Sequence, residues 1–118
     1  MKYACLVYAE PGFHLRLPPD ELAALDRDSL AYDTRLAHAG HFLAASALKG
    51  TESATTIRVR GGKVLATDGP FAETKEILCG FIFIEARDEA AARRIAEGVP
   101  MARYGSIELR PELIIGGG

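Results

Sequence analysis

The chain has 118 residues, of which 48% are hydrophobic and 25% charged, which predicts one globular domain spanning residues 1–118. Fourteen basic residues against sixteen acidic ones give a formal net charge of −2, and no basic cluster is interleaved with aromatic residues, which argues against a nucleic-acid partner. No segment approaches the ~20 apolar residues of a membrane helix, and the N-terminus lacks the apolar run of a signal peptide, so we expect a cytoplasmic protein without a membrane partner.

The first strand, residues 2–9, is apolar on both alternating faces, which predicts a central position in its sheet. A helix is predicted from Pro19, which is tolerated in a first turn, to Gly40, which can end the helix with a left-handed residue. The hydroxyls of Ser29 and Tyr32 interrupt the apolar stripe of this helix. They either bond local backbone groups or face a cavity above the sheet.

The middle of the chain predicts a short strand followed by a hairpin. Residues 42–48 are rich in small side chains, which favours the close approach of a ligand or a helix. Residues 54–60 and 63–68 flank Gly61-Gly62, and this two-residue spacing favours a primed hairpin turn. The resulting register places Asp68 on the apolar face of the hairpin.

The last third of the chain predicts a strand, a helix and a final strand. Residues 77–86 are nearly all apolar and predict a second central strand. Asp88 is a good N-cap for a helix that ends before Pro100, and residues 106–112 form a last strand in which Pro111 predicts an edge position. The predicted fold class is α+β, a ferredoxin-like βαββαβ core with an inserted β-hairpin.

Candidate site residues cluster in and near the segment 68–76, where a Gly-Pro break leaves a carboxylate at a strand end. We assign Asp68 as the candidate catalytic acid or base. The candidate ligand-binding residues are Lys75, Arg103, Tyr104, Glu73 and Arg58. A structural turn capped by Asp68, with the other charges solvated, explains the same segment equally well.

Several kinds of chemistry are not indicated. The sequence has no nucleophile elbow, phosphate loop or helix-borne metal spacing, and Lys75 interrupts the carboxylates of its segment, so we expect neither a metal nor another cofactor. Cys5 and Cys79 are predicted to be reduced and buried on neighbouring central strands.

Two segments carry a family resemblance. Residues 68–76, DGPFAETKE, resemble the signature of the DGPF branch of the YCII-related family, and residues 102–111, ARYGSIELRP, resemble the C-terminal motif of that branch. The first strand and the hairpin are similar as well, so the resemblance covers nearly the whole chain. It implies a ferredoxin-like subunit that dimerises into a dimeric α/β-barrel-type assembly, within a family of largely unassigned function.

The resemblance also bears on the histidines. Relatives in the wider group are thought to use a histidine and aspartate pair, with the histidine in the first helix. This chain offers only His38 at the end of that helix, not at the matching place. Whether His14, His38 or His41 joins a site is left open.

A homodimer is also expected from the predicted fold. Right-handed crossovers place both helices on one face of the sheet, while the two central strands are apolar on both faces. One copy alone would expose a large apolar patch, which a second copy can cover.

Two functions are consistent with these observations. The first is an enzyme that acts on a small anionic organic molecule by proton transfer or elimination, with Asp68 as acid or base and Arg103 or Lys75 as the anion clamp. The alternative is a non-catalytic ligand-binding or regulatory module, because proteins of this branch resemble partners of extracytoplasmic-function sigma factors.

Overall fold

The computed structural model describes residues 1–116, so the last two residues of the predicted domain lie outside the described part. The strands are β1 (Lys2–Ala9), β2 (Phe42–Ala47), β3 (Thr55–Arg60), β4 (Lys63–Asp68), β5 (Ile77–Glu85) and β6 (Ser106–Pro111). The helices are α1 (Pro19–His38) and α2 (Glu89–Gly98), with the short 3-10 turns η1 (Phe13–Arg16), η2 (Thr51–Ser53) and η3 (Pro100–Arg103). The order of elements is the predicted one, and the α+β class is confirmed.

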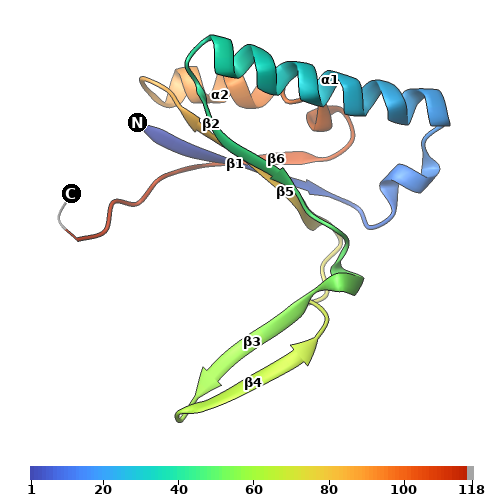
Figure 1. Cartoon of the computed structure of the whole chain (residues 1–118), viewed down its shortest axis with the longest axis vertical. Coiled ribbons are helices and arrows are strands. Elements are labelled where there is room, and N and C mark those ends of the chain that lie inside the picture. The colour runs from blue at the N-terminus through green and yellow to red at the C-terminus, as the bar shows by residue number, and fades with distance from the viewer. Residues whose placement is uncertain (117–118) are drawn as a thin grey trace.

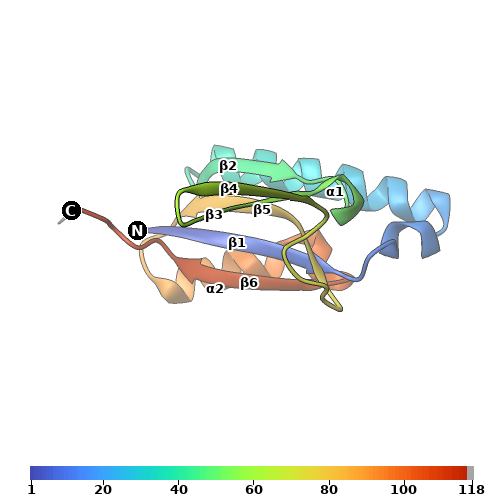
Figure 2. The same ribbon diagram turned by 90° about the horizontal axis from the view of Figure 1, so that it is seen from below.

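The main sheet has four antiparallel strands in the order β2-β5-β1-β6. The predicted central strands, β1 and β5, lie in the middle, and β6 lies at an edge, as Pro111 predicted. Both helices lie on the same side of this sheet (Figures 1 and 2). No helix in the described part of the chain is long and apolar enough to cross a membrane.

The core lies between the sheet and the two helices. Tyr3, Cys5 and Ile84 are its largest fully buried side chains, and they alternate along β1 and β5 with residues of the other face. Leu36 of α1 and Ile95 of α2 pack into the same cluster. Alternate residues of the two central strands thus supply the layer that the helices cover.

The opposite face of the sheet carries apolar side chains that the helices do not cover. Leu6 and Tyr8 of β1 alternate with the buried residues of that strand, as do Phe81 and Phe83 in β5, and all four are half-buried. The Tyr8 hydroxyl donates a 3.4 Å hydrogen bond to Glu108 on the neighbouring edge strand. This face is therefore apolar at its centre and polar at its β6 edge.

Local sequence signals account for the helix ends. Asp88 caps α2 as predicted, because its Oδ1 accepts a 2.8 Å hydrogen bond from the backbone N–H of Ala91. Helix α1 has proline at its first position, and Gly40 follows its end with φ of 80°.

Strands β3 and β4 form a hairpin, here called the arm (Thr55–Asp68), that projects from the side of the sheet opposite the helices (Figure 1). The predicted register is confirmed: Val59 faces Val64 across the turn, and Thr55 faces Asp68. Val59 and Val64 are 58% and 69% exposed. An isolated two-stranded hairpin is marginally stable in water, so the arm is suited to packing against another surface.

The prediction of two buried thiols is confirmed for Cys5 and wrong for Cys79, which is half-buried. The two cysteines do lie on neighbouring strands, β1 and β5. The β1–β5 pairing shifts at this point, since Tyr8 pairs with Leu78 and Val7 with Gly80, which leaves Cys79 as the extra residue of a bulge. The bulge interrupts the alternation of side chains along β5, and Cys79 lines the surface of a groove.

Candidate functional site

A groove of about 1120 Å³ runs between α1 and the sheet. Its wall on α1 is a stripe of residues three and four positions apart, which turns one side of the helix toward the sheet. These α1 residues are Leu22, Leu25, Asp26, Ser29, Leu30 and Asp33. The sheet contributes parts of β2 and β5, and the loop with η1 adds a further wall.

Small side chains on β2 leave room for this space. Ala45 and Ala47 line the groove, together with Ser46. The small-residue signal of β2 thus corresponds to an open space beside the sheet. Ser29 also lines the groove. Of the two roles predicted for its hydroxyl, a bond to local backbone or a position facing a cavity, the second is the one observed.

The charged residues that line the groove are mostly acidic. Four carboxylates, those of Glu10, Asp26, Asp33 and Glu52, are joined by a single basic side chain, Lys49. Arg16, which does not line the groove, donates a 3.2 Å hydrogen bond to Glu10 and partly neutralises the charge of that carboxylate. The remaining negative charge opposes the binding of an anion here.

Asp33 is the carboxylate best suited to proton transfer. It is half-buried, and this burial raises the pKa of its carboxyl above the ordinary value. Ser29 lies one helical turn before it on the same side of α1. A carboxyl with a raised pKa is a stronger base than an ordinary aspartate, which suits it to general acid–base chemistry.

Two further groups of the groove have chemical potential. His14 of η1 is exposed and packs edge-on against the ring of Phe13, with ring centroids 5.8 Å apart. Cys79 donates a 3.4 Å hydrogen bond to the carbonyl of Ile77, and desolvation raises the pKa of its thiol. Cys79 is therefore a neutral thiol at physiological pH rather than a thiolate nucleophile.

Asp68 ends β4 on the apolar face of the arm, where it was predicted, and its side chain is exposed. It lines neither of the two cavities described here. Within residues 1–116 its carboxylate makes neither a hydrogen bond nor an ion pair, so it does not cap its own turn. Within the described residues of a single chain, Asp68 thus lines neither cavity and forms no ion pair with a cation.

The other charges of the predicted site are spread over the surface. Arg58 is exposed on the opposite face of the arm, where it pairs with Leu65. Glu73 and Lys75 are exposed in the segment between β4 and β5. None of the three lines the groove.

Arg103 and Tyr104 join the C-terminal motif to α1. Arg103 donates a 3.1 Å hydrogen bond to Asp28, and the Tyr104 hydroxyl donates a 2.6 Å hydrogen bond to Glu21. That bond to Glu21 raises the pKa of Tyr104. The next residue, Gly105, has no room for a side chain because a Cβ would overlap the carbonyl oxygen of Tyr8. These contacts give the motif a structural explanation.

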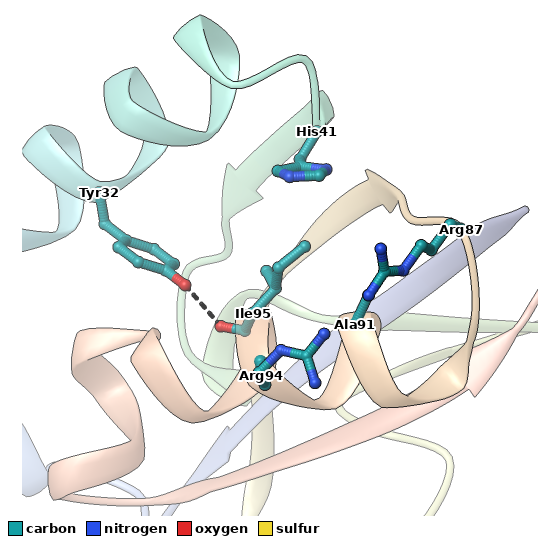
Figure 3. Close-up of a pocket in the computed structure, with 6 residues that line it drawn as sticks. All are labelled: Tyr32, His41, Arg87, Ala91, Arg94 and Ile95. Atoms are coloured by element: carbon teal, nitrogen blue, oxygen red, sulfur yellow. Dashed lines mark hydrogen bonds between the residues drawn. The ribbon is translucent and has the colours of Figure 1, made fainter.

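A second cavity, of about 420 Å³, lies between α1 and α2 (Figure 3). It is lined by Tyr32, His41, Arg87, Ala91, Arg94 and Ile95. The Tyr32 hydroxyl donates a 2.7 Å hydrogen bond to the carbonyl of Ile95, so it bonds the backbone of another helix while its side chain lines a cavity. Nothing in the sequence singled out Arg87 and Arg94, because Arg87 lies before the N-cap of α2 and the two side chains meet only in the fold.

The profile of the YCII-related domain matches residues 1–112. An uncharacterized protein of Rhizobium meliloti (strain 1021) is 36% identical over 115 residues, which cover 94% of this chain and 91% of that protein.

Among solved structures, the chain is similar to 5-chloro-2-hydroxyhydroquinone dehydrochlorinase (TftG) from Burkholderia phenoliruptrix AC1100, in complex with 2,5-dihydroxybenzoquinone. The TM-score is 0.55 at 15% sequence identity, and the match covers 96% of this chain and 94% of the other. At this identity the likeness shows a shared fold.

Proposed function

This chain belongs to the YCII-related family, and we propose that it binds a small organic molecule in the groove beneath α1, with Asp33 as the acid or base. The observation that carries the proposal is a half-buried carboxyl of raised pKa on the wall of the largest cavity described. A cavity with apolar walls and a few polar groups is the usual form of a small-molecule site.

The charge of the groove favours a neutral ligand that bears hydroxyl groups, rather than the anion expected from the sequence. Carboxylates accept hydrogen bonds from hydroxyls, and Asp26 and Asp33 offer such acceptors on the same wall. The structurally similar dehydrochlorinase was solved with 2,5-dihydroxybenzoquinone, which supports a ligand of this size.

The proposed chemistry is proton transfer by Asp33. In its ionised form the carboxylate takes a proton from the bound ligand, and in its protonated form it returns one. A raised pKa brings both forms closer to balance near neutral pH, which is the condition for efficient general acid–base catalysis. Ser29, one turn away, would orient the ligand through its hydroxyl.

We also propose that the ferredoxin-like subunit forms a homodimer of the dimeric α/β-barrel type. Support comes from the uncovered face of the sheet, with Leu6, Phe81 and Phe83 at its centre. The arm projects from that same side and carries exposed Val59 and Val64 (Figure 1). A second copy is the partner that can bury both surfaces at once through a two-fold interface.

In such a dimer Asp68 would lie at the subunit boundary, because it shares the apolar face of the arm with Val64. An acid–base role for Asp68 therefore depends on the second copy. Arg58, Lys75 and Glu73 could contribute to a site only in the same way.

The function is tested by a two-dimensional NMR titration of the full chain with hydroquinone, a neutral dihydroxy compound. The proposal predicts saturable shifts of the amides of Ser29, Asp33 and Cys79. Saturable shifts confined to the arm and the segment 68–76 would contradict the groove and favour the Asp68 site. Saturable binding in the groove without any ligand conversion would retain the binding function and contradict the acid–base role.

A further inference from the structure

We propose that the cavity between α1 and α2 is a second ligand site, which binds the phosphate group of a small phosphate monoester. This inference does not depend on the groove, because the two cavities share no lining residue. At about 420 Å³ the cavity is within the range of roughly 300–1,000 Å³ found for small-molecule sites.

The two charged side chains that line this cavity, Arg87 and Arg94, are both basic, and His41 adds a side chain with ring nitrogens beside them. Arg87 approaches the cavity from the β5–α2 connection and Arg94 from the middle of α2, and His41 covers it from the α1–β2 connection (Figure 3). Arg35 adds a further positive charge beside it, stacked over the ring of Tyr32 at 5.4 Å. In a chain with a net charge of −2, this is a local concentration of positive charge.

Little in the chain neutralises that charge. Arg87 has an ion pair with Asp88 at 3.6 Å, between side chains that are both largely exposed, and such surface pairs contribute little. Arg94 has no ion pair within residues 1–116. Two guanidinium groups that line one cavity repel each other, and a bound anion removes this repulsion.

The geometry favours a tetrahedral oxyanion. The Nδ1 atom of His41 lies 2.9 Å from the carbonyl oxygen of Glu85, and because a carbonyl only accepts, Nδ1 carries the hydrogen. This bond fixes the ring and leaves Nε2 available: in the neutral ring Nε2 accepts a hydrogen bond from a protonated phosphate oxygen, and in the imidazolium it donates one to an ionised oxygen. His41, Arg87 and Arg94 then offer polar groups from three directions, which matches three terminal phosphate oxygens better than the two oxygens of a planar carboxylate.

The test is isothermal titration of the full chain with phenyl phosphate, and with malonate as the planar alternative. The variants are Arg87→Gln, Arg94→Gln and Arg94→Lys, with Arg93→Gln as the control. Arg93 lies on the same helix and is exposed, and it does not line the cavity, so the control removes the same charge at a neighbouring position.

We expect Arg87→Gln and Arg94→Gln each to weaken phenyl phosphate binding by about tenfold or more, since each removes a charge-assisted hydrogen bond. Arg94→Lys should bind more tightly than Arg94→Gln, and Arg93→Gln should change the affinity by less than about twofold, as expected for an exposed charge outside the cavity. Equal losses in Arg93→Gln and Arg94→Gln would overturn the proposal. Tighter binding of malonate, or wild-type binding too weak to saturate, would overturn it as well.

The variant Asp33→Asn tests whether phenyl phosphate binds in this cavity or in the groove. Phenyl phosphate binding should be unchanged in this variant, because Asp33 lies in the other cavity. A loss of phosphate binding in Asp33→Asn would show that the phosphate binds in the groove instead, and would contradict the second site.

Discussion

The hydroxyl of Tyr32 in α1 donates a 2.7 Å hydrogen bond to the carbonyl oxygen of Ile95 in α2. Ile95 lies in the last turn of α2, where carbonyl groups have no partner within the helix. A side chain of α1 thus provides a hydrogen-bond partner for a backbone carbonyl in the last turn of α2. The same contact holds together the two helices that form the walls of the second cavity and cover the sheet.

Tyr32→Phe should lower the free energy of unfolding by about 0.5–1.5 kcal/mol, because the carbonyl of Ile95 loses its partner while the ring remains. Urea denaturation measures the change. Tyr8→Phe is the matched control, since its hydroxyl makes only a longer, 3.4 Å bond on the exposed side, and its effect should be smaller. An equal effect of the two variants would mean that the link between the helices does not stabilise the fold.

Asp33→Asn should raise the melting temperature at pH 7. Burial raises the pKa of this carboxyl in the folded state, so the folded chain holds the proton more tightly than the unfolded chain. Stability is therefore lost as the pH rises from the unfolded value of 3.8 through the raised folded value. Asparagine cannot ionise, so the variant should gain stability above this range and gain none below pH 3.8. A variant less stable than the wild type at pH 7 would contradict the raised pKa.

Cys5 should resist thiol reagents in the native state, while Cys79 should react. Cys5 is fully buried, and desolvation raises its pKa to about 11, whereas Cys79 is half-buried on the groove. Mass spectrometry after timed labelling identifies the modified cysteine. Labelling of Cys5 as fast as Cys79 would contradict this arrangement.

The same raised pKa predicts a loss of stability in alkali. The unfolded chain releases the Cys5 proton near pH 9 and the folded chain only near pH 11, so stability falls between these values. The slope due to this thiol is at most about 1.4 kcal/mol per pH unit, and it should be absent in Cys5→Ala. Equal slopes in the two proteins would show that Cys5 does not cause the loss.

The proposed dimer predicts that the two faces of the arm behave differently. Val64→Lys places a charge on the apolar face and should shift the chain toward the monomer, as measured by light scattering. Leu65→Lys is the control on the opposite face, where residue 65 pairs with Arg58, and it should leave the dimer intact. Both side chains are at least 50% exposed in the single chain, so neither change should disturb the fold of the subunit. A wild-type mass of 12.7 kDa would contradict the dimer itself.

Local signals in the sequence predicted most of the fold. The positive φ angles of Gly61 and Gly62 fix the hairpin register, and the side-chain cap at Asp88 starts α2 where expected. The projection of the arm away from the main sheet could not be predicted, because the packing of a hairpin depends on contacts between residues that are distant in sequence. The bulge at Cys79 was missed for a related reason: it depends on the pairing with β1.

The site was predicted less well than the fold. Dense charge in the segment 68–76 drew attention to Asp68, but charge density does not reveal whether a cavity lies nearby. Ser29 was recognised as a hydroxyl in an apolar stripe, and Asp33 was missed although it lies four residues later on the same side of α1. The predicted stripe continued from Ser29 to Tyr32, and Asp33 lies directly beside it on the side of α1 that faces the groove.

The most direct test of the groove compares the affinity of hydroquinone, a neutral dihydroxy compound, for the wild type, Asp33→Asn and Asp68→Asn by isothermal titration. The groove places Asp33 against the ligand and leaves Asp68 outside it. We predict that Asp33→Asn weakens binding by about tenfold or more, the cost of a lost charge-assisted hydrogen bond, while Asp68→Asn binds like the wild type. Wild-type affinity in Asp33→Asn together with lost binding in Asp68→Asn would contradict the account.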